Sequence, residues 1–406
     1  MEKYMNDSLM LEKKVIWFMA LIQFINAVDF MIVMPLGADF ANALHMSAAN
    51  IGYLGGGYTL AAAVSSLLVA KYIDRFDRKR VVLVMLIGLS VATLLCAHAW
   101  NMKSLMFTRI LAGFFAGPLI AISLAIVTDC IPVERRGRAI ATVMGAFSIA
   151  AIAGVPLGLK LASWYGWSTP FNVVGASGML VAAMVVVLLP SLKGHLQGTT
   201  SMSPGVSLLA LMANRQVLLA ISSLGLAVLS TFLLLPSLAV WLQLNAGVAR
   251  DDLSMYYLIG GGVSVIALQI FGRMVDNMGA RSVAVGLAIG IFAVIFDGFM
   301  HAPVLPPLVI FIAFMALTAT RTIVATTVNT TVPAPNVRAA FMSLQSICQN
   351  VFSGLAAILS SSILVEEQQQ LHNLEILAAC ALALTLVQPL VLRRLIKQQS
   401  LSPVKP

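Results

Sequence analysis

The chain is poor in charged side chains. Of its 406 residues, 10% are charged and 60% are hydrophobic, and the mean hydropathy is +0.94. A water-soluble domain carries roughly 25% charged residues, so the composition predicts a membrane protein. The net charge of +9 does not by itself indicate a nucleic-acid partner, because lysine and arginine also gather in the cytoplasmic loops of membrane proteins.

The chain also lacks the residue patterns of metal sites, disulfides, ATP binding and membrane-embedded catalysis. Its four cysteines lie in or at the ends of apolar runs without CxxC spacing, and its five histidines form no metal-spaced cluster. The glycine-rich run Gly260–Gly262 lacks the lysine of a phosphate-binding loop. No Ser/His pair, HExxH motif or pair of intramembrane aspartates at matching depth occurs. We therefore expect no metal, no cofactor and no enzymatic activity.

Twelve apolar runs are present, each long enough to cross a bilayer core as a helix. The stretch 191–214 contains Gly, Ser, Thr and Pro204, separates six runs from six, and predicts a cytoplasmic linker. The expected fold is an all-α membrane protein whose twelve transmembrane helices form two pseudo-symmetric six-helix bundles, 1–190 and 215–406. The runs are 15–38, 50–72, 80–99, 104–130, 138–162, 168–190, 215–243, 253–275, 281–300, 304–331, 338–364 and 372–393.

Lysine and arginine are distributed unequally between the two sides of these runs. With the N-terminus inside, 20 of the 25 lie on the cytoplasmic side, and three (Lys103, Lys160 and Arg250) lie outside. This asymmetry predicts that both termini are cytoplasmic. The first run continues for about twenty residues without a small-residue cleavage site, so we expect a retained helix rather than a removed signal peptide.

A charge-dense stretch, Ala70–Arg80, returns in altered form 202 residues later as Gly272–Arg281. At this offset Asp74 corresponds to Asp276, and Asp77 corresponds to Gly279. A repeat of loops between the two halves of a membrane chain is typical of two-lobed transporters.

Two opposite charges lie within the predicted spans of the first half. Asp29 falls near the middle of the first run, and Arg109 falls in the first turns of the fourth. An unpaired ionised carboxylate is costly at that depth, so Arg109 is a candidate partner. Three roles for Asp29 are open: a proton-coupling site tuned by Arg109, a substrate contact, or a member of a fixed ion pair.

The second half has one intramembrane cation and one polar helix face. Arg321 lies deep in the tenth run, where it either binds a ligand anion or bonds to carbonyls at a helix break. Gln345 and Gln349 are four residues apart in the eleventh run, as expected for a cavity wall. With Gln23 and Asn26 of the first run, these are the candidate substrate-binding residues of a cavity between the two halves.

Charged residues also gather at the cytoplasmic ends of the runs. Asp129 ends the fourth run, and with Asp74 and Arg78 it is expected to form a charge-assisted network. Such a network ties helix ends together in one conformation and separates in another. Together with Asp276, these residues are the candidate gating residues.

Over essentially its whole length the chain resembles the major facilitator superfamily. Asp74, Arg75, Arg78 and Lys79 match the signature Gly-x-x-x-Asp-Arg-x-Gly-Arg-Lys between helices 2 and 3, whereas Ala70 and Asp77 replace its two glycines. The second copy matches at Gly272, Asp276 and Gly279, and Arg109 with Gly113 resembles the helix 4 signature Arg-x-x-x-Gly. In similar proteins the loop Asp and Arg form a relay with the helix 4 Asp that stabilises the outward-open state. That resemblance assigns the relay to Asp74, Arg78 and Asp129.

Within the superfamily, the runs Asp29–Pro35 and Gly154–Gly158 look like those of the twelve-helix drug:proton antiporter group, which has bacterial efflux members. One departure is that Val155 precedes Pro156, where the group's helix 5 signature has a glycine. The resemblance implies a monomeric secondary transporter of the bacterial inner membrane that exports a small organic molecule by proton antiport. Its partners would be the substrate, protons and the lipid bilayer, with no nucleic acid. The alternative is proton-coupled uptake of an anionic metabolite or siderophore-like chelate, with Arg109 and Arg321 binding its carboxylates.

Overall fold

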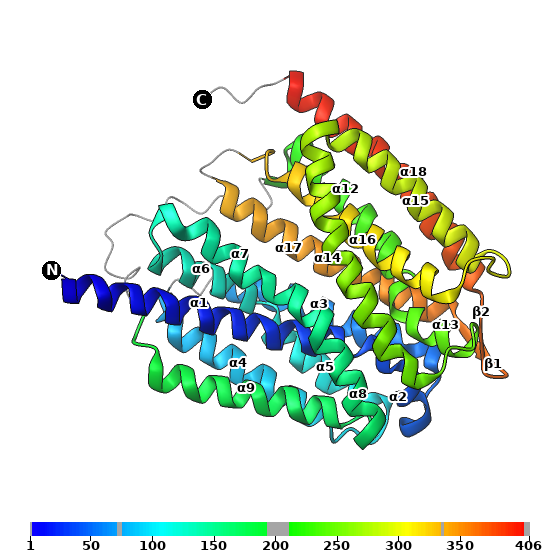
Figure 1. The fold of residues 1–406 in the computed structure, drawn as a ribbon, viewed down its shortest axis with the longest axis horizontal. Helices are drawn as coiled ribbons and strands as arrows, with labels where there is room; N and C mark the ends of the chain where they lie inside the picture. The colour runs from blue at the N-terminus through cyan, green and yellow to red at the C-terminus, as the bar shows by residue number, and fades with distance from the viewer. Residues whose placement is uncertain (1, 71–74, 193–210, 334–336, 402–406) are drawn as a thin grey trace. The chain divides into compact units, whose positions relative to one another are not determined.

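The structure, a computed structural model, describes residues 2–70, 75–192, 211–333 and 337–401 (Figure 1). Contacts divide the chain into two compact units: residues 1–46 and 57–201 form the first, and residues 47–56 and 202–406 form the second. Within the described residues, twelve helical segments are long and apolar enough to cross a membrane. Each overlaps one of the twelve expected runs, so the prediction of twelve spans is confirmed.

The helices of the first unit lie side by side. α4 (Arg78–Cys96) runs along α9 (Thr169–Leu188) and α5 (Met102–Ala116), and α1 (Glu2–Met31) runs along α7 (Val133–Ile149) and α6 (Leu119–Cys130) (Figure 1). The shorter elements are η1 (Met34–Leu36), α2 (Gly37–Leu44), the π-helical turn η4 (Ala150–Gly154) and α8 (Val155–Tyr165). Most of α3 (Ile51–Ala70) also belongs to this unit.

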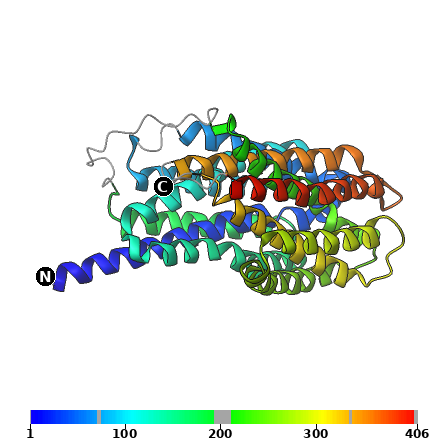
Figure 2. The same ribbon diagram turned by 90° about the horizontal axis from the view of Figure 1, so that it is seen from above.

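The long helices of the second unit also pack side by side. α18 (Leu374–Leu401) lies beside α12 (Arg215–Phe232) and α15 (Ala280–Phe299), as Figures 1 and 2 show. α16 (Pro307–Asn329) packs against α14 (Leu253–Met278) and α15, and α17 (Arg338–Ile363) packs against α12. The shorter elements are η2 (Ala48–Asn50), the start of α3, η5 (Leu235–Ser237), α13 (Leu238–Leu244), η6 (Arg250–Asp252) and the strands β1 (Val365–Glu367) and β2 (Gln370–His372).

Prolines interrupt several spans. Pro35 and Pro236 lie in the 3₁₀ turns η1 and η5, which separate α1 from α2 and α12 from α13. Pro156 follows the π-helical turn η4 in the fifth span. Proline has no N–H for the bond to the carbonyl four residues earlier, so the regular α-helix gives way at these points.

Apolar side chains fill the interior of each unit and also cover its outside. In the first unit Leu86 and Ile122 are fully buried. By contrast Trp17, Phe107 and Val187 are 69%, 66% and 79% exposed. Large apolar side chains left outside a packed core require an apolar solvent, and lipid supplies it. The chain is therefore a multi-pass membrane protein.

The hairpin between α17 and α18 was not predicted. β1 pairs antiparallel with β2, with Val365 opposite His372 and Glu367 opposite Gln370. Its sequence is short and mostly polar, so it gives a weak strand signal. A tertiary contact supports it instead: the Asn245 side chain donates to the Leu371 carbonyl (3.0 Å) and accepts from the Leu371 N–H (3.1 Å).

Candidate functional site

The centre of the first unit holds a buried ion pair. Arg109 Nη1 of α5 lies 3.0 and 3.1 Å from the two carboxylate oxygens of Asp29 in α1, and both side chains are 0% exposed. Arg109 Nη2 also donates to the Asp29 backbone carbonyl (3.3 Å). The partnership expected from the sequence is therefore present. Two charges removed from water are tolerated because each compensates the other.

Neighbouring groups hold this pair in position. Thr93 of α4 donates its hydroxyl to Asp29 Oδ1 (2.7 Å), and the Tyr58 ring of α3 lies 4.4 Å from the Arg109 guanidinium carbon. A cation over an aromatic face is stabilised by the ring quadrupole. Tyr58 can lie there because α3 and α5 touch at Gly113, where a Cβ would collide with the Tyr58 carbonyl. The glycine four residues after Arg109 thus sets the close approach that brings Tyr58 over the guanidinium.

The two polar candidates beside Asp29 make contacts within the first unit. Gln23 is 0% exposed and donates to the Leu119 carbonyl (3.0 Å) and to the Ser123 hydroxyl (2.8 Å) of α6. Asn26 is buried and accepts a long hydrogen bond from the Tyr58 hydroxyl (3.5 Å). Gln23 therefore ties α1 to α6, and its carboxamide oxygen has no hydrogen-bond partner among the described residues.

The small residues of the fifth span pack against the same stretch of α1. A Cβ at Gly154 would contact Val28, and a Cβ at Gly158 would contact Ile32. Close helix approach through small residues is common in membranes because it maximises van der Waals contact. The bent fifth span therefore packs on both sides of Asp29 along α1.

A second ion pair lies at the other end of α4. Arg78 Nε lies 3.1 Å from Asp129 Oδ2 of α6, with side chains 9% and 31% exposed, so two members of the expected gating network are in contact. Asp74, the third member, lies outside the described residues. Asp276 is exposed near the end of α14 in the second unit.

Asp77 occupies the position where the superfamily signature has glycine, and it makes contacts that the sequence did not predict. Its carboxylate accepts from the Lys79 N–H (2.9 Å), the Ser191 hydroxyl (2.6 Å) and the Leu192 N–H (3.0 Å). It caps the N-terminus of α4 and anchors the chain where the predicted linker begins.

The second unit contains a buried guanidinium with a different environment. Arg321 of α16 is 1% exposed and donates to the Ala227 carbonyl (2.8 Å) and to three hydroxyls. These hydroxyls belong to Ser230 (2.7 Å), Thr231 (2.9 Å) and Thr385 (3.0 Å). Among the described residues no carboxylate forms an ion pair with Arg321, and its Nε has no hydrogen-bond partner.

The remaining polar candidates lie on α17. Gln345 is buried and accepts from Asn329 Nδ2 of α16 (3.2 Å), which also donates to the Ala220 carbonyl (3.0 Å). Gln349, one turn further along, is half-buried. In the described part of the chain no group of three His, Cys, Asp or Glu side chains is placed to hold a metal ion.

Thr93, Thr385 and Asp77 were missed by reasoning from the sequence alone. Threonine occurs often in apolar spans, and the partner of Thr93 lies 64 residues away in the chain. Thr385 likewise meets Arg321 from 64 residues away. The departure from the signature at position 77 was the signal that could have identified Asp77.

Comparison with known proteins identifies the family. Residues 19–394 match the family model of the Major Facilitator Superfamily. The fold is similar to that of a bacterial homologue of the human lysosomal transporter Spinster in an inward-facing, unoccupied conformation (TM-score 0.73, 17% identity, 95% of both chains covered). It is also similar to that of the nucleoside transporter NupG (TM-score 0.74, 12% identity, 94% of this chain and 99% of that chain covered). The chain is therefore a membrane transporter rather than an enzyme, and it belongs to the Major Facilitator Superfamily.

Proposed function

We propose that this protein is a proton-coupled secondary transporter that exports a small organic molecule, and that Asp29 carries the proton. The observation that supports this role is the fully buried Asp29–Arg109 pair. A buried carboxylate is tolerated as an ion while the guanidinium is next to it. If Arg109 moves away, the neutral acid costs far less free energy than the bare anion, so Asp29 takes up a proton.

The surroundings of Asp29 fit such an exchange between two protonation states. Thr93 donates a hydrogen bond to Asp29 Oδ1, and a hydroxyl can also accept a hydrogen bond from a neutral carboxylic acid. The bent fifth span packs on α1 at Val28 and Ile32, on either side of Asp29 along the chain. A movement of this span is therefore able to change the position of Asp29 relative to Arg109. The export direction is supported by the resemblance of Asp29–Pro35 and Gly154–Gly158 to drug:proton antiporters.

The test is transport in proteoliposomes with an imposed pH gradient and a panel of small organic substrates. Wild-type protein should move at least one substrate against the direction of proton flow. Asp29→Asn should abolish the pH-driven flux while the protein still inserts and folds. Asp39→Asn, a change of the same kind in the half-buried start of α2, is the matched control and should transport normally. Full pH-driven transport by Asp29→Asn would remove Asp29 from the mechanism.

A second candidate function, proton-coupled uptake of an anionic molecule, is favoured by Arg321. At the offset of 202 residues that relates the two loop motifs, Asp29 corresponds to Thr231. Thr231 of the seventh span contacts Arg321 of the tenth, as Asp29 of the first span contacts Arg109 of the fourth, although Arg109 itself corresponds to Phe311 at this offset. The second unit therefore has a buried guanidinium bonded to a hydroxyl where the first unit has one bonded to a carboxylate. A buried cation that is bonded to neutral acceptors binds an anion more strongly than a paired one does.

Thr231→Asp tests this candidate by supplying the missing carboxylate. If the substrate provides the negative charge, Thr231→Asp should abolish its transport, whereas the neutral control Thr231→Asn should retain most of it. Binding of benzoate, benzamide and benzamidine to purified protein measures the charge preference, because the three probes have similar size and shape. Equal binding of benzoate and benzamide, or normal transport by Thr231→Asp, would rule out this role of Arg321.

A further inference from the structure

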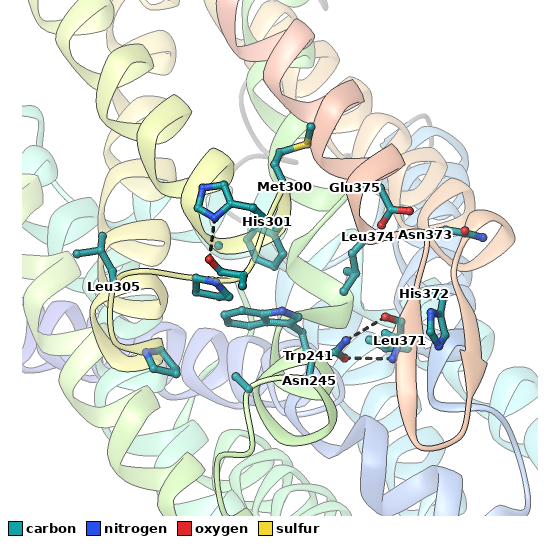
Figure 3. Close-up of a pocket in the computed structure, with 16 residues that line it drawn as sticks. Trp241, Asn245, Met300, His301, Leu305, Leu371, His372, Asn373, Leu374 and Glu375 are labelled. Atoms are coloured by element: carbon teal, nitrogen blue, oxygen red, sulfur yellow. Dashed lines mark hydrogen bonds between the residues drawn. The ribbon is translucent and has the colours of Figure 1, made fainter.

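A cavity of about 650 Å³ lies at one end of the second unit, between α13, the end of α15 and the β1–β2 hairpin (Figure 3). Its floor is apolar, with the buried side chains of Trp241, Phe299, Leu371 and Leu374. The rings of Trp241 and Phe299 lie 4.9 Å apart, centroid to centroid. A cavity of this volume is large enough to hold a small organic molecule.

Both walls of the cavity are held by specific hydrogen bonds. On one side, the paired bonds between Asn245 and the Leu371 backbone fasten the hairpin to α13 (Figure 3). On the other, the Asp297 carboxylate accepts from the N–H groups of Val304 (3.2 Å) and Leu305 (3.1 Å) and shapes the loop after α15. The cavity is therefore part of the fold of this unit and does not depend on loosely packed side chains.

The polar groups at the rim combine one acid with two imidazoles. Glu375, His301 and His372 line the cavity, and their side chains are exposed. His301 Nδ1 lies 2.7 Å from the Ala302 carbonyl oxygen. Because a carbonyl oxygen can only accept a hydrogen bond, Nδ1 is the donor, and Nε2 of His301 is therefore the acceptor in the neutral ring. In the described part of the chain Glu375 has no ion pair. With Glu375 ionised and both imidazoles neutral, the rim carries one negative charge.

The segments that contribute residues to this cavity are mostly acidic. The loops 245–252 and 297–306 and the segment 364–375 contain six carboxylates and one cationic side chain, Arg250. The carboxylates belong to Asp251, Asp252, Asp297, Glu366, Glu367 and Glu375. A concave site with an excess of charge of one sign nearby concentrates ligands of the opposite sign. The cavity therefore combines apolar side chains with a carboxylate at its rim, and the segments that form it carry an excess of negative charge.

We propose that this cavity binds an amphipathic organic cation. Its apolar part would lie on Trp241 and Phe299, and its cationic group would lie near Glu375. The site is separate from the Arg321 cluster, because Arg321 is fourteen residues along α16 from Pro307 at the cavity wall, or roughly 20 Å at the helical rise. The inference goes beyond the proposed function, since it depends on neither proton coupling nor the direction of transport.

The test is equilibrium dialysis of the purified full-length protein in non-ionic detergent at pH 8 and low salt. The probes are tetraphenylphosphonium and tetraphenylborate, which have nearly the same size and opposite charge. We expect the cation to bind more tightly. Glu375→Gln should weaken its binding about three- to fivefold, as expected for the loss of one exposed ionic contact. Because Glu375 is exposed, this variant should melt at the wild-type temperature.

A matched variant shows whether the charge acts locally. Glu367→Gln removes one negative charge from the same end of the unit but outside the cavity lining, and it should change binding less than twofold. Equal binding of the two probes, no effect of Glu375→Gln, or an equal loss in Glu367→Gln would each overturn the proposal. None of these results bears on Asp29, which lies in the first unit.

Discussion

Replacing Asp29 with asparagine isolates the charge of the buried pair from its shape. The asparagine oxygen can still accept from Thr93 and from Arg109, which lie 2.7 and 3.0 Å from Asp29 Oδ1. What disappears is the negative charge at a place where both side chains are 0% exposed. Arg109 is left with the Asp29 backbone carbonyl at 3.3 Å and the ring of Tyr58 at 4.4 Å. Neither group compensates a full positive charge.

Removing one partner of a buried pair costs about 3–5 kcal/mol, because the other charge is left uncompensated. For a unit of this size each 1 kcal/mol lowers the melting temperature by about 2–4 °C, so Asp29→Asn should melt at least about 6 °C lower. The double variant Asp29→Asn/Arg109→Gln leaves no bare charge and should recover more than half of that loss. Thermal unfolding of the purified protein in detergent, followed by circular dichroism, measures all the variants. If the losses of stability in Asp29→Asn and in Arg109→Gln simply add in the double variant, the two side chains do not act as a pair and the reasoning is wrong.

Three further predictions follow from contacts in the first unit. Gly113→Ala should lower the free energy of unfolding by about 1–3 kcal/mol, because the added Cβ collides with the Tyr58 carbonyl. Gly145→Ala, which has open space around its Cβ, is the control and should not destabilise the protein, as a comparison of the two melting temperatures will show. Arg78→Gln and Asp129→Asn should each cost about 1 kcal/mol or less, since the pair is partly exposed, and the double variant should cost less than the sum of the two single changes. Asp77→Ala should speed hydrogen exchange of the Leu192 backbone N–H, which loses its acceptor, whereas Glu134→Ala on the exposed start of α7 should not change it. Unchanged exchange in Asp77→Ala would mean that Asp77 does not hold this segment.

The spans were predictable because their signal is local. A bilayer requires about twenty apolar residues in a row, and each of the twelve runs contains such a stretch within itself. The breaks at Pro35 and Pro236 also have a local cause, although the sequence alone does not say whether a proline bends a membrane helix or ends it. The β1–β2 hairpin depends on Asn245, which lies 126 residues from Leu371, and no local pattern contains that contact.

The candidate site was predictable where charge is rare. Asp29 and Arg109 stand out because an ionisable side chain in an apolar run needs a compensating partner, and the structure brings these two together. The hydroxyls of Thr93 and Thr385 do not stand out, since a hydroxyl in a helix can donate its hydrogen bond to the carbonyl of the preceding turn. The Thr93 hydroxyl lies within hydrogen-bond distance of both the Leu89 carbonyl (2.8 Å) and Asp29 Oδ1 (2.7 Å), and its single proton is donated to one of the two at a time. Only the fold shows which hydroxyls turn toward a charge.

In the proposed mechanism, the difference between Asp29 and Thr231 gives the two units different tasks. In the first unit the guanidinium has a carboxylate that belongs to the chain, so the balance of charge changes only when a proton binds or leaves. In the second unit the guanidinium is bonded to a carbonyl and three hydroxyls, so a ligand is able to supply the missing negative charge. Alternating access requires that a proton and a substrate each change the stability of the same conformations. In the proposed mechanism, two buried guanidinium sites, of which one is compensated and the other is not, provide that combination. Exchanging Asp29 and Thr231 between the units should then transfer the proton-binding group from the first unit to the second.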